Sequence, residues 1–175
     1  MIDLPPDLAL LVETSRLRLI PLAIDGAEDL FPVLNDERLH EFTGEGHKTA
    51  DEFEEWIELG RRRRSVDGSA VFLTWVIRLV PSEQPLGYCQ ATIHDDASAD
   101  VHIVVGTHYA GHGVATEAVD GMVRALRGPL GVGELRVHIH PENHVAQQLF
   151  ARAGLHCSGM VDPVGDEVWF SPRPD

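Results

Sequence analysis

The sequence predicts an α+β fold in which antiparallel strands come first and strands alternating with helices follow. Residues 71–79 place apolar side chains at every second position, as expected of a half-buried strand. A β-branched run at 101–105 leads through a glycine-rich turn into an amphipathic segment that Gly128 ends. A strand at 135–139 then precedes a second helix. The later part of the chain therefore has the order β-α-β-α-β.

The first part of the chain predicts one strand and three helices. Residues 1–12 are expected to be an N-terminal extension of a single domain that covers residues 1–175. The first strand, at 16–20, has Leu17 and Leu19 on its inner face. Pro32 is expected to weaken the first helix. The three helices are expected at residues 23–34, at residues 37–42 and from Thr49 onward.

The remaining elements follow without repeats or linkers. The helix after the glycine-rich turn has acidic residues early and basic residues late, which suits the helix dipole. Asn143 can cap the second helix of this region and Gly154 can end it. Further strands are expected at residues 86–94, 100–105, 135–139, 155–160 and 167–170.

The glycine-rich turn predicts a phosphorylated cofactor. Gly111 and Gly113, followed by small residues, let backbone N–H groups converge at the N-terminus of the next helix. A P-loop would need Lys-Ser/Thr where Ala115-Thr116 stands. A dinucleotide fold would need a third glycine and an acidic residue on the next strand. A third design with this order is the pyrophosphate cradle for coenzyme A, which the downstream residues favour.

Two signatures carry a family resemblance. Residues 141–155 read Pro-Glu-Asn-His-Val-Ala-Gln-Gln-Leu-Phe-Ala-Arg-Ala-Gly-Leu, and residues 110–115 read Ala-Gly-His-Gly-Val-Ala. The first segment resembles the second signature of the GNAT N-acetyltransferase superfamily, in which an Asn opens a helix and a basic-x-Gly turn closes it. The other resembles its Gln/Arg-x-x-Gly-x-Gly/Ala signature, with Ala110 at the first position. Residues 13–30 are similar to the branch that includes ribosomal-protein N-terminal acetyltransferases.

The resemblance implies a mixed, mostly antiparallel sheet of about six or seven strands flanked by helices. It also implies a V-shaped splay between two parallel strands, here 100–105 and 135–139. Acetyl-CoA would lie in this splay as co-substrate, and no metal is expected. The residues expected to hold it are Ile103, Val104 and Val105 along the pantetheine arm, Gly111, His112, Gly113, Val114, Ala115 and Thr116 at the pyrophosphate, Asn143 at the arm and Arg152 at a phosphate.

The activity that the resemblance implies is transfer of an acetyl group to a primary amine by direct attack in a ternary complex. The acceptor would be a protein N-terminus or a small molecule. The amine must lose a proton, which is easier for an α-amino group than for a lysine. Asp100, and after it His102, are the expected bases on one strand face. Similar proteins carry a proton-donating Tyr or Ser where Phe150 and Ala146 stand here.

The acceptor is expected to contact the variable segment 31–64 and the strand beside it. The residues expected to contact the amine are Glu41, Phe42, Glu45, Trp56, Tyr88 and Gln90. Two other functions stay open. The chain could bind acyl-CoA without turnover, as a sensor. His138, His140 and His144 could instead hold zinc for hydrolysis.

Composition limits the partners. The net charge of −14 argues against nucleic-acid binding and favours a cationic acceptor. The sequence shows no targeting segment and no apolar run of about 18 residues, so a cytoplasmic protein without membrane contact is expected. Cys89 and Cys157 are expected to be reduced and buried. Trp169 and Phe170, if exposed, would favour a homodimer.

Overall fold

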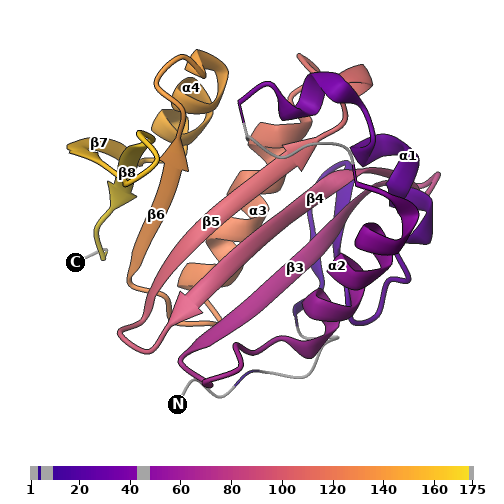
Figure 1. Ribbon diagram of the computed structural model, residues 1–175, viewed down its shortest axis with the longest axis horizontal. Coiled ribbons are helices and arrows are strands. Elements are labelled where there is room, and N and C mark those ends of the chain that lie inside the picture. The colour runs from indigo at the N-terminus through magenta and orange to yellow at the C-terminus, as the bar shows by residue number, and fades with distance from the viewer. Residues whose placement is uncertain (1–3, 5–9, 43–47, 174–175) are drawn as a thin grey trace.

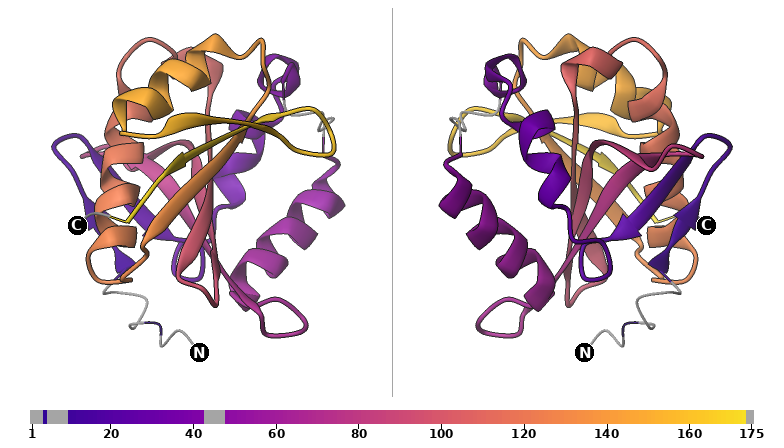
Figure 2. Two further views of the ribbon diagram at one scale, coloured as in Figure 1. Left: turned by 90° about the vertical axis from the view of Figure 1, so that its left-hand side faces the viewer. Right: turned by 90° about the vertical axis from the view of Figure 1, so that its right-hand side faces the viewer.

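The computed structural model describes residue 4, residues 10–42 and residues 48–173. Its strands form one eight-stranded sheet in the order β1-β2-β3-β4-β5-β6-β8-β7, with helices on both faces (Figures 1 and 2). The strands are β1 (Val12–Glu13), β2 (Leu17–Pro21), β3 (Ala70–Leu79), β4 (Gln84–His94), β5 (Ser98–Val105), β6 (Glu134–Ile139), β7 (His156–Val161) and β8 (Glu167–Ser171). The helices are α1 (Phe31–Leu34), α2 (Ala50–Arg62), α3 (Val114–Arg127) and α4 (His144–Arg152).

The predicted α+β fold is confirmed, with eight strands in place of six or seven. The additional strand is β1, whose two residues are too short to show a sequence pattern. The segment expected as an N-terminal extension contributes to the core. The side chain of Leu10 is 1% exposed, and the carbonyl oxygen of Leu10 accepts a hydrogen bond from Trp75 Nε1 at 2.8 Å.

The helix expected over residues 23–34 is wrong. Glu28–Leu30 forms a 3₁₀ turn, and only the four residues of α1 are α-helical. Ala27 has φ 58°, in the left-handed region, and its N–H donates to the buried side chain of Asp25 at 2.9 Å. This local bond offers the backbone an alternative to the helix.

The next two helix predictions differ in outcome. Residues 37–42 contain a 3₁₀ turn at Glu37–His40 in place of a short helix. The helix from Thr49 is confirmed as α2. It begins with a capping box, in which the Thr49 side chain accepts from the Glu52 N–H and Glu52 bonds back to the N–H of Thr49.

The sheet opens between its two parallel strands. β5 and β6 pair only at Ser98–Asp100 with Glu134–Arg136. Beyond these positions the strands diverge, and Figure 1 shows them separating toward α4. Both strands run in the same direction, so the turn after β5 and the turn after β6 lie at the same end of the sheet. The predicted splay is therefore present.

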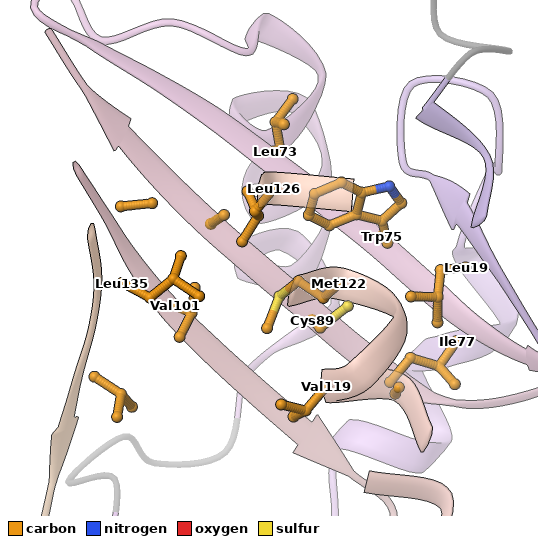
Figure 3. Close-up of a cluster of buried hydrophobic side chains, with 14 of the residues drawn as sticks. Leu19, Leu73, Trp75, Ile77, Cys89, Val101, Val119, Met122, Leu126 and Leu135 are labelled. Carbon is orange, nitrogen blue, oxygen red and sulfur yellow. The ribbon is translucent and has the colours of Figure 1, made fainter. Parts of the chain in front are cut away.

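Apolar side chains fill both faces of the sheet. The larger cluster lies between the sheet and α3 and includes Trp75, Met122 and Leu135 (Figure 3). The smaller cluster lies under α1 and α2 and includes Phe53, Ile57 and Tyr88. On β5, Val101 faces the larger cluster. The neighbouring positions on β5 therefore face the side of α1 and α2.

Three expectations about exposure need correction. Both cysteines are free, but only Cys89 is buried, because Cys157 lies on the edge strand β7 and is exposed. Trp169 and Phe170 are half-buried, and Trp169 packs against the larger core cluster and donates to Glu167 at 3.0 Å. They do not form the exposed pair on which the homodimer expectation was based. Within the described residues, no helix has the length and apolar composition needed to span a bilayer.

Candidate active site

The glycine-rich turn begins α3 in the way the sequence predicts. Gly111 and Gly113 both have φ 75°, and Gly113 is the N-cap residue of α3. A Cβ atom added at Gly111 would meet nothing within 4 Å, and one at Gly113 would meet only Arg16 Nη2, at 3.3 Å. The left-handed backbone, more than crowding, therefore explains the glycines. The space beside the turn is free for a ligand.

Four backbone N–H groups are available at this helix end. The first helical hydrogen bond runs from the N–H of Glu117 to the carbonyl of Gly113, at 3.1 Å. Within the part of the chain that the structure describes, the amides of residues 113–116 donate to no protein acceptor. An open groove lined by residues of the β1–β2 turn and of α3 reaches Gly113 and Thr116. Such amides at the positive end of a helix bind phosphate groups.

Arg16, which the sequence did not indicate as a site residue, lies beside this turn. Its Nη1 donates to the carbonyl oxygen of His112 at 3.0 Å, and its Nε donates to Glu117 Oε2 at 2.7 Å. The other oxygen of Glu117 accepts from the side chains of Thr14 and Ser15 and from the N–H of Arg16. Partial burial would raise the pKa of Glu117, but these hydrogen bonds outweigh it and lower the pKa to about 2.

The lowered pKa of Glu117 predicts a pH-dependent contribution to stability. Its stabilisation is present above the unfolded-state value of about 4.3 and is lost as the pH falls toward the folded-state value. Because Arg16 is half exposed, we expect Glu117→Gln to lower the free energy of unfolding by only about 1–2 kcal/mol at pH 7.

Urea denaturation at pH 7 and at pH 3 measures this contribution. The deficit of Glu117→Gln should shrink at pH 3, because the Glu117 carboxyl is then mostly protonated in the unfolded chain but still mostly charged in the folded protein, so the unfolded state gains stability relative to the folded state. Glu13→Gln is the matched control, since the side chain of Glu13 forms an exposed ion pair with Arg18. An equal deficit in both variants at pH 7 would contradict a specific role for the Glu117 network.

The other residues expected to hold the cofactor lie along the splay and at its open end. Ile103, Val104 and Val105 belong to the part of β5 that has left β6, and they pair only with β4 on the other side. Asn143 caps α4, its Oδ1 accepting from the N–H of Ala146 at 3.1 Å. Its side-chain NH₂ group is thereby directed away from the helix amide. Arg152 is exposed in the last turn of α4.

Three of the six residues expected at the acceptor lie on α2 and on the sheet face beneath it. Trp56 of α2 contacts Tyr88 of β4 with ring centroids 4.9 Å apart, and Tyr88 contacts His102 at 5.8 Å. Gln90 lies opposite His102 in the β4–β5 register and donates to Thr74 Oγ1 at 3.2 Å. Trp56, Tyr88, Gln90 and His102 thus form a row that runs from α2 across β4 to β5, the first strand of the splay.

The segment after the 3₁₀ turn at Glu37–His40 reaches the other strand of the splay. The ring of Phe42 lies 5.6 Å from the ring of His140, just beyond the end of β6. Glu41 is exposed. Glu45 lies outside the described residues. Aromatic groups from both sides therefore border the space where β5 and β6 diverge.

Asp100 lies at the closed end of the splay, in the last pair that joins β5 and β6. Its carboxylate is surrounded by basic groups. His94 Nε2 lies 2.6 Å from Oδ2, and Arg136 Nε lies 3.3 Å from Oδ1. His138 Nε2 lies 4.0 Å from the same Oδ1. The structure thus brings Asp100, which the sequence indicated as a base, together with three groups that it did not indicate as bases. These are His94, Arg136 and His138.

The three histidines considered for zinc do not converge. His138 contacts Asp162, His140 contacts the ring of Phe42, and His144 contacts Gln147. Among the residues that the structure describes, no group of three His, Cys, Asp or Glu side chains is arranged to hold a metal ion.

Comparisons with known proteins agree with this geometry. The family model described as "Acetyltransferase (GNAT) domain" matches residues 16–156. No curated protein sequence matches the chain.

Three solved structures illustrate the fold similarity. A proposed ribosomal-protein-serine acetyltransferase from Vibrio cholerae has 19% identity and a TM-score of 0.75, covering 93% of this chain and 97% of that one. A spermidine N-acetyltransferase from Vibrio cholerae, in complex with CoA and spermine, has 16% identity and a TM-score of 0.72, with coverage of 90% and 94%. An aminoglycoside acetyltransferase in complex with coenzyme A has 20% identity and a TM-score of 0.71, with coverage of 90% and 94%.

Proposed function

Because the chain belongs to the GNAT acetyltransferase family, we propose that it transfers an acetyl group from acetyl-CoA to a primary amine by direct attack in a ternary complex. The acceptor is a peptide N-terminus or a small-molecule amine. The observation that carries the proposal is the set of available amides at residues 113–116, which follow β5 at the open end of the splay between β5 and β6. The amides suit the diphosphate of coenzyme A, and the unpaired edge of β5 suits its extended pantetheine arm.

The acetyl-CoA site in this proposal follows the splay. The backbone of residues 103–105 bonds the pantetheine arm, because these positions of β5 have no partner on β6. The amides of residues 113–116 take the pyrophosphate, whereas the N–H of His112 already donates to the carbonyl oxygen of Tyr109 at 3.4 Å. Arg16, half exposed beside His112, adds a positive charge. Asn143 and Arg152 complete the site from α4.

The acceptor in this proposal enters from the side of α1 and α2. Phe42, Trp56 and Tyr88 form an apolar border that holds an amine near the acetyl carbon. Gln90 and Glu41 supply polar contacts. Asp100 and His102 face the amine, and the net charge of −14 favours a cationic acceptor. The similar structures include enzymes named for spermidine and aminoglycosides, both of which carry amines.

A non-catalytic acyl-CoA sensor is the second candidate, and one observation favours it. Phe150, at a position where similar proteins carry a proton donor, is 3% exposed and belongs to the core. Ala146, at the other such position, also lacks a donor. Catalysis without such a donor requires the thiolate to leave unassisted, which the thiol pKa near 8.5 permits. We place the protein in the cytoplasm, where both free cysteines would stay reduced.

Acetyl-CoA binding and an amine panel test the function directly. We expect acetyl-CoA at about one hundred times its Kd to stabilise the protein by about 2.7 kcal/mol. A panel of N-terminal peptides, polyamines and aminoglycosides, followed by release of free thiol, should then contain an acceptor. Stabilisation without thiol release from any amine would favour the sensor. Stabilisation by zinc but not by acetyl-CoA would contradict both.

A further inference from the structure

We propose that His138 is the base that takes a proton from the acceptor amine, and that Asp162 is the residue that positions it. This inference rests on the proposed acetyl transfer and names the proton acceptor for it. Asp100 then holds the ammonium group that His138 deprotonates.

The first step is the position of His138. β6 and β5 are parallel and pair Arg136 with Asp100. Two residues further on, His138 and His102 occupy equivalent positions on the two diverging strands. His138 therefore lies on the same sheet face as Asp100 and Tyr88. It lies across the splay from the ring contacts that join Trp56, Tyr88 and His102. The proposed thioester lies between the two strands, so His138 borders the reacting atoms.

The second step is the contact that orients the ring. His138 Nδ1 lies 2.8 Å from Oδ2 of Asp162, in the turn between β7 and β8. Oδ1 of Asp162 accepts the N–H groups of Val164 and Asp166 at 3.0 and 2.9 Å. Burial acts to raise the pKa of Asp162, but the bonds from His138 and from these amides lower it below its usual value. The carboxylate stays charged and accepts a hydrogen bond from Nδ1–H, which leaves Nε2 as the free base.

The third step concerns the other ring nitrogen. Nε2 of His138 lies 4.0 Å from Oδ1 of Asp100, too far for a direct hydrogen bond. One ammonium nitrogen placed between them can donate to both atoms at about 2.9 Å. The side chain of Asp162 is 15% exposed, whereas that of His138 is 41% exposed. The positioning carboxylate is thus largely shielded from solvent, and the base it orients is more accessible.

The charged groups around His138 separate its role from that of Asp100. Asp162 lies on its Nδ1 side, and Asp100 on its Nε2 side. Arg136, on the same strand, and His94, on β4, both contact Asp100. Because the oxygens of Asp100 already contact these basic groups, Asp100 offers the ammonium group a further hydrogen-bond acceptor, while Nε2 of His138 is suited to accept its proton.

The reaction then balances as follows. The ammonium gives one proton to Nε2 of His138, which passes it to solvent. The neutral nitrogen bonds to the acetyl carbon, the carbon–sulfur bond breaks, and the thiolate leaves with the electron pair. The second amine proton goes to that thiolate. The products are the acetamide, the free thiol of coenzyme A and one released proton.

The test compares His138→Gln with His156→Gln, a change at an exposed histidine on the edge strand β7. We expect His138→Gln to lower kcat by about 10²–10³-fold, with the Kd for acetyl-CoA unchanged within about twofold. The acidic limb of the pH–rate profile should disappear. His156→Gln should keep the wild-type rate and profile.

Acceptors of different basicity separate a base from a structural residue. An α-amino acceptor, with a pKa near 8, is partly neutral at pH 7, whereas an ε-amino acceptor, with a pKa near 10.4, is not. The loss in His138→Gln should therefore be larger for the ε-amine, and Asp162→Asn should show a smaller loss in the same direction. An equal loss for both amines, or a retained acidic limb, would overturn the proposal. Failure of wild-type protein to acetylate any amine would overturn the proposed function instead.

Discussion

Gly113→Leu is expected to weaken acetyl-CoA binding by at least about 100-fold, or about 2.7 kcal/mol, while the protein still folds. Gly113 is the N-cap of α3 at φ 75°, where a leucine is strained. Its side chain would extend into the groove that the amides of residues 113–116 border, and relief of the strain would turn those amides away from one another. Both effects act on the proposed pyrophosphate site.

Gly131→Leu controls for backbone strain in this experiment. Gly131 has φ 64°, and a Cβ atom there would meet nothing within 4 Å. It lies between α3 and β6, at the opposite end of α3 from the site. Both variants should lose about 1–2 kcal/mol of stability in urea denaturation, but only Gly113→Leu should lose acetyl-CoA binding by calorimetry. Equal affinity in Gly113→Leu and wild type would exclude these amides as the pyrophosphate site.

The sequence predicts those parts of this structure that depend on neighbouring residues. The strand, glycine turn and helix around Gly113 are read from periodicity and from the need for a left-handed residue. Asn143 as the cap of α4 follows from side-chain chemistry within three positions. The single mixed sheet and its splay were implied by the family resemblance, because pairing between distant strands leaves no local periodicity.

The ionic contacts that shape the site could not be predicted in this way. Glu117 bonds Arg16 from 101 positions away, and Asp162 bonds His138 from 24 positions away. Alternation along β6 places His138 on the acceptor face, so the sheet face of His138 can be predicted from the sequence. Asp162 lies in a turn, where no periodicity assigns a direction to a side chain.

The helix predicted over residues 23–34 also failed because of a contact between residues distant in sequence. Asp25 pairs with Arg78, 53 positions away. Arg78 Nε and Nη2 donate to the two oxygens of Asp25 at 2.5 and 2.7 Å, and both guanidinium nitrogens Nη1 and Nη2 donate to Asp29 at 2.9 Å. The hydrogen bonds to Asp25, and after them those to Asp29, raise the pKa of Arg78. This contact holds the segment before α1 against β3.

Arg78→Gln is therefore expected to lower the free energy of unfolding by about 3–5 kcal/mol, because it leaves the Asp25 carboxylate buried without its partner. The side chains of Arg78 and Asp25 are only 11% and 5% exposed, so water cannot replace the lost contact. The double variant Asp25→Asn, Arg78→Gln should lose less than Arg78→Gln alone, since no charge remains buried. Urea denaturation at pH 7 measures all three proteins.

Arg18→Gln is the matched control, because Arg18 lies opposite Arg78 in the β2–β3 register. Its ion pairs with Glu13 and Glu83 are at the surface, where those carboxylates are 65% and 46% exposed, so its loss should cost no more than about 1 kcal/mol. Equal costs for Arg18→Gln and Arg78→Gln would mean that water reaches Asp25. A large cost for Arg78→Gln alone, reduced in the double variant, would show that a buried charge pair, more than helix propensity, sets the path of the chain into α1.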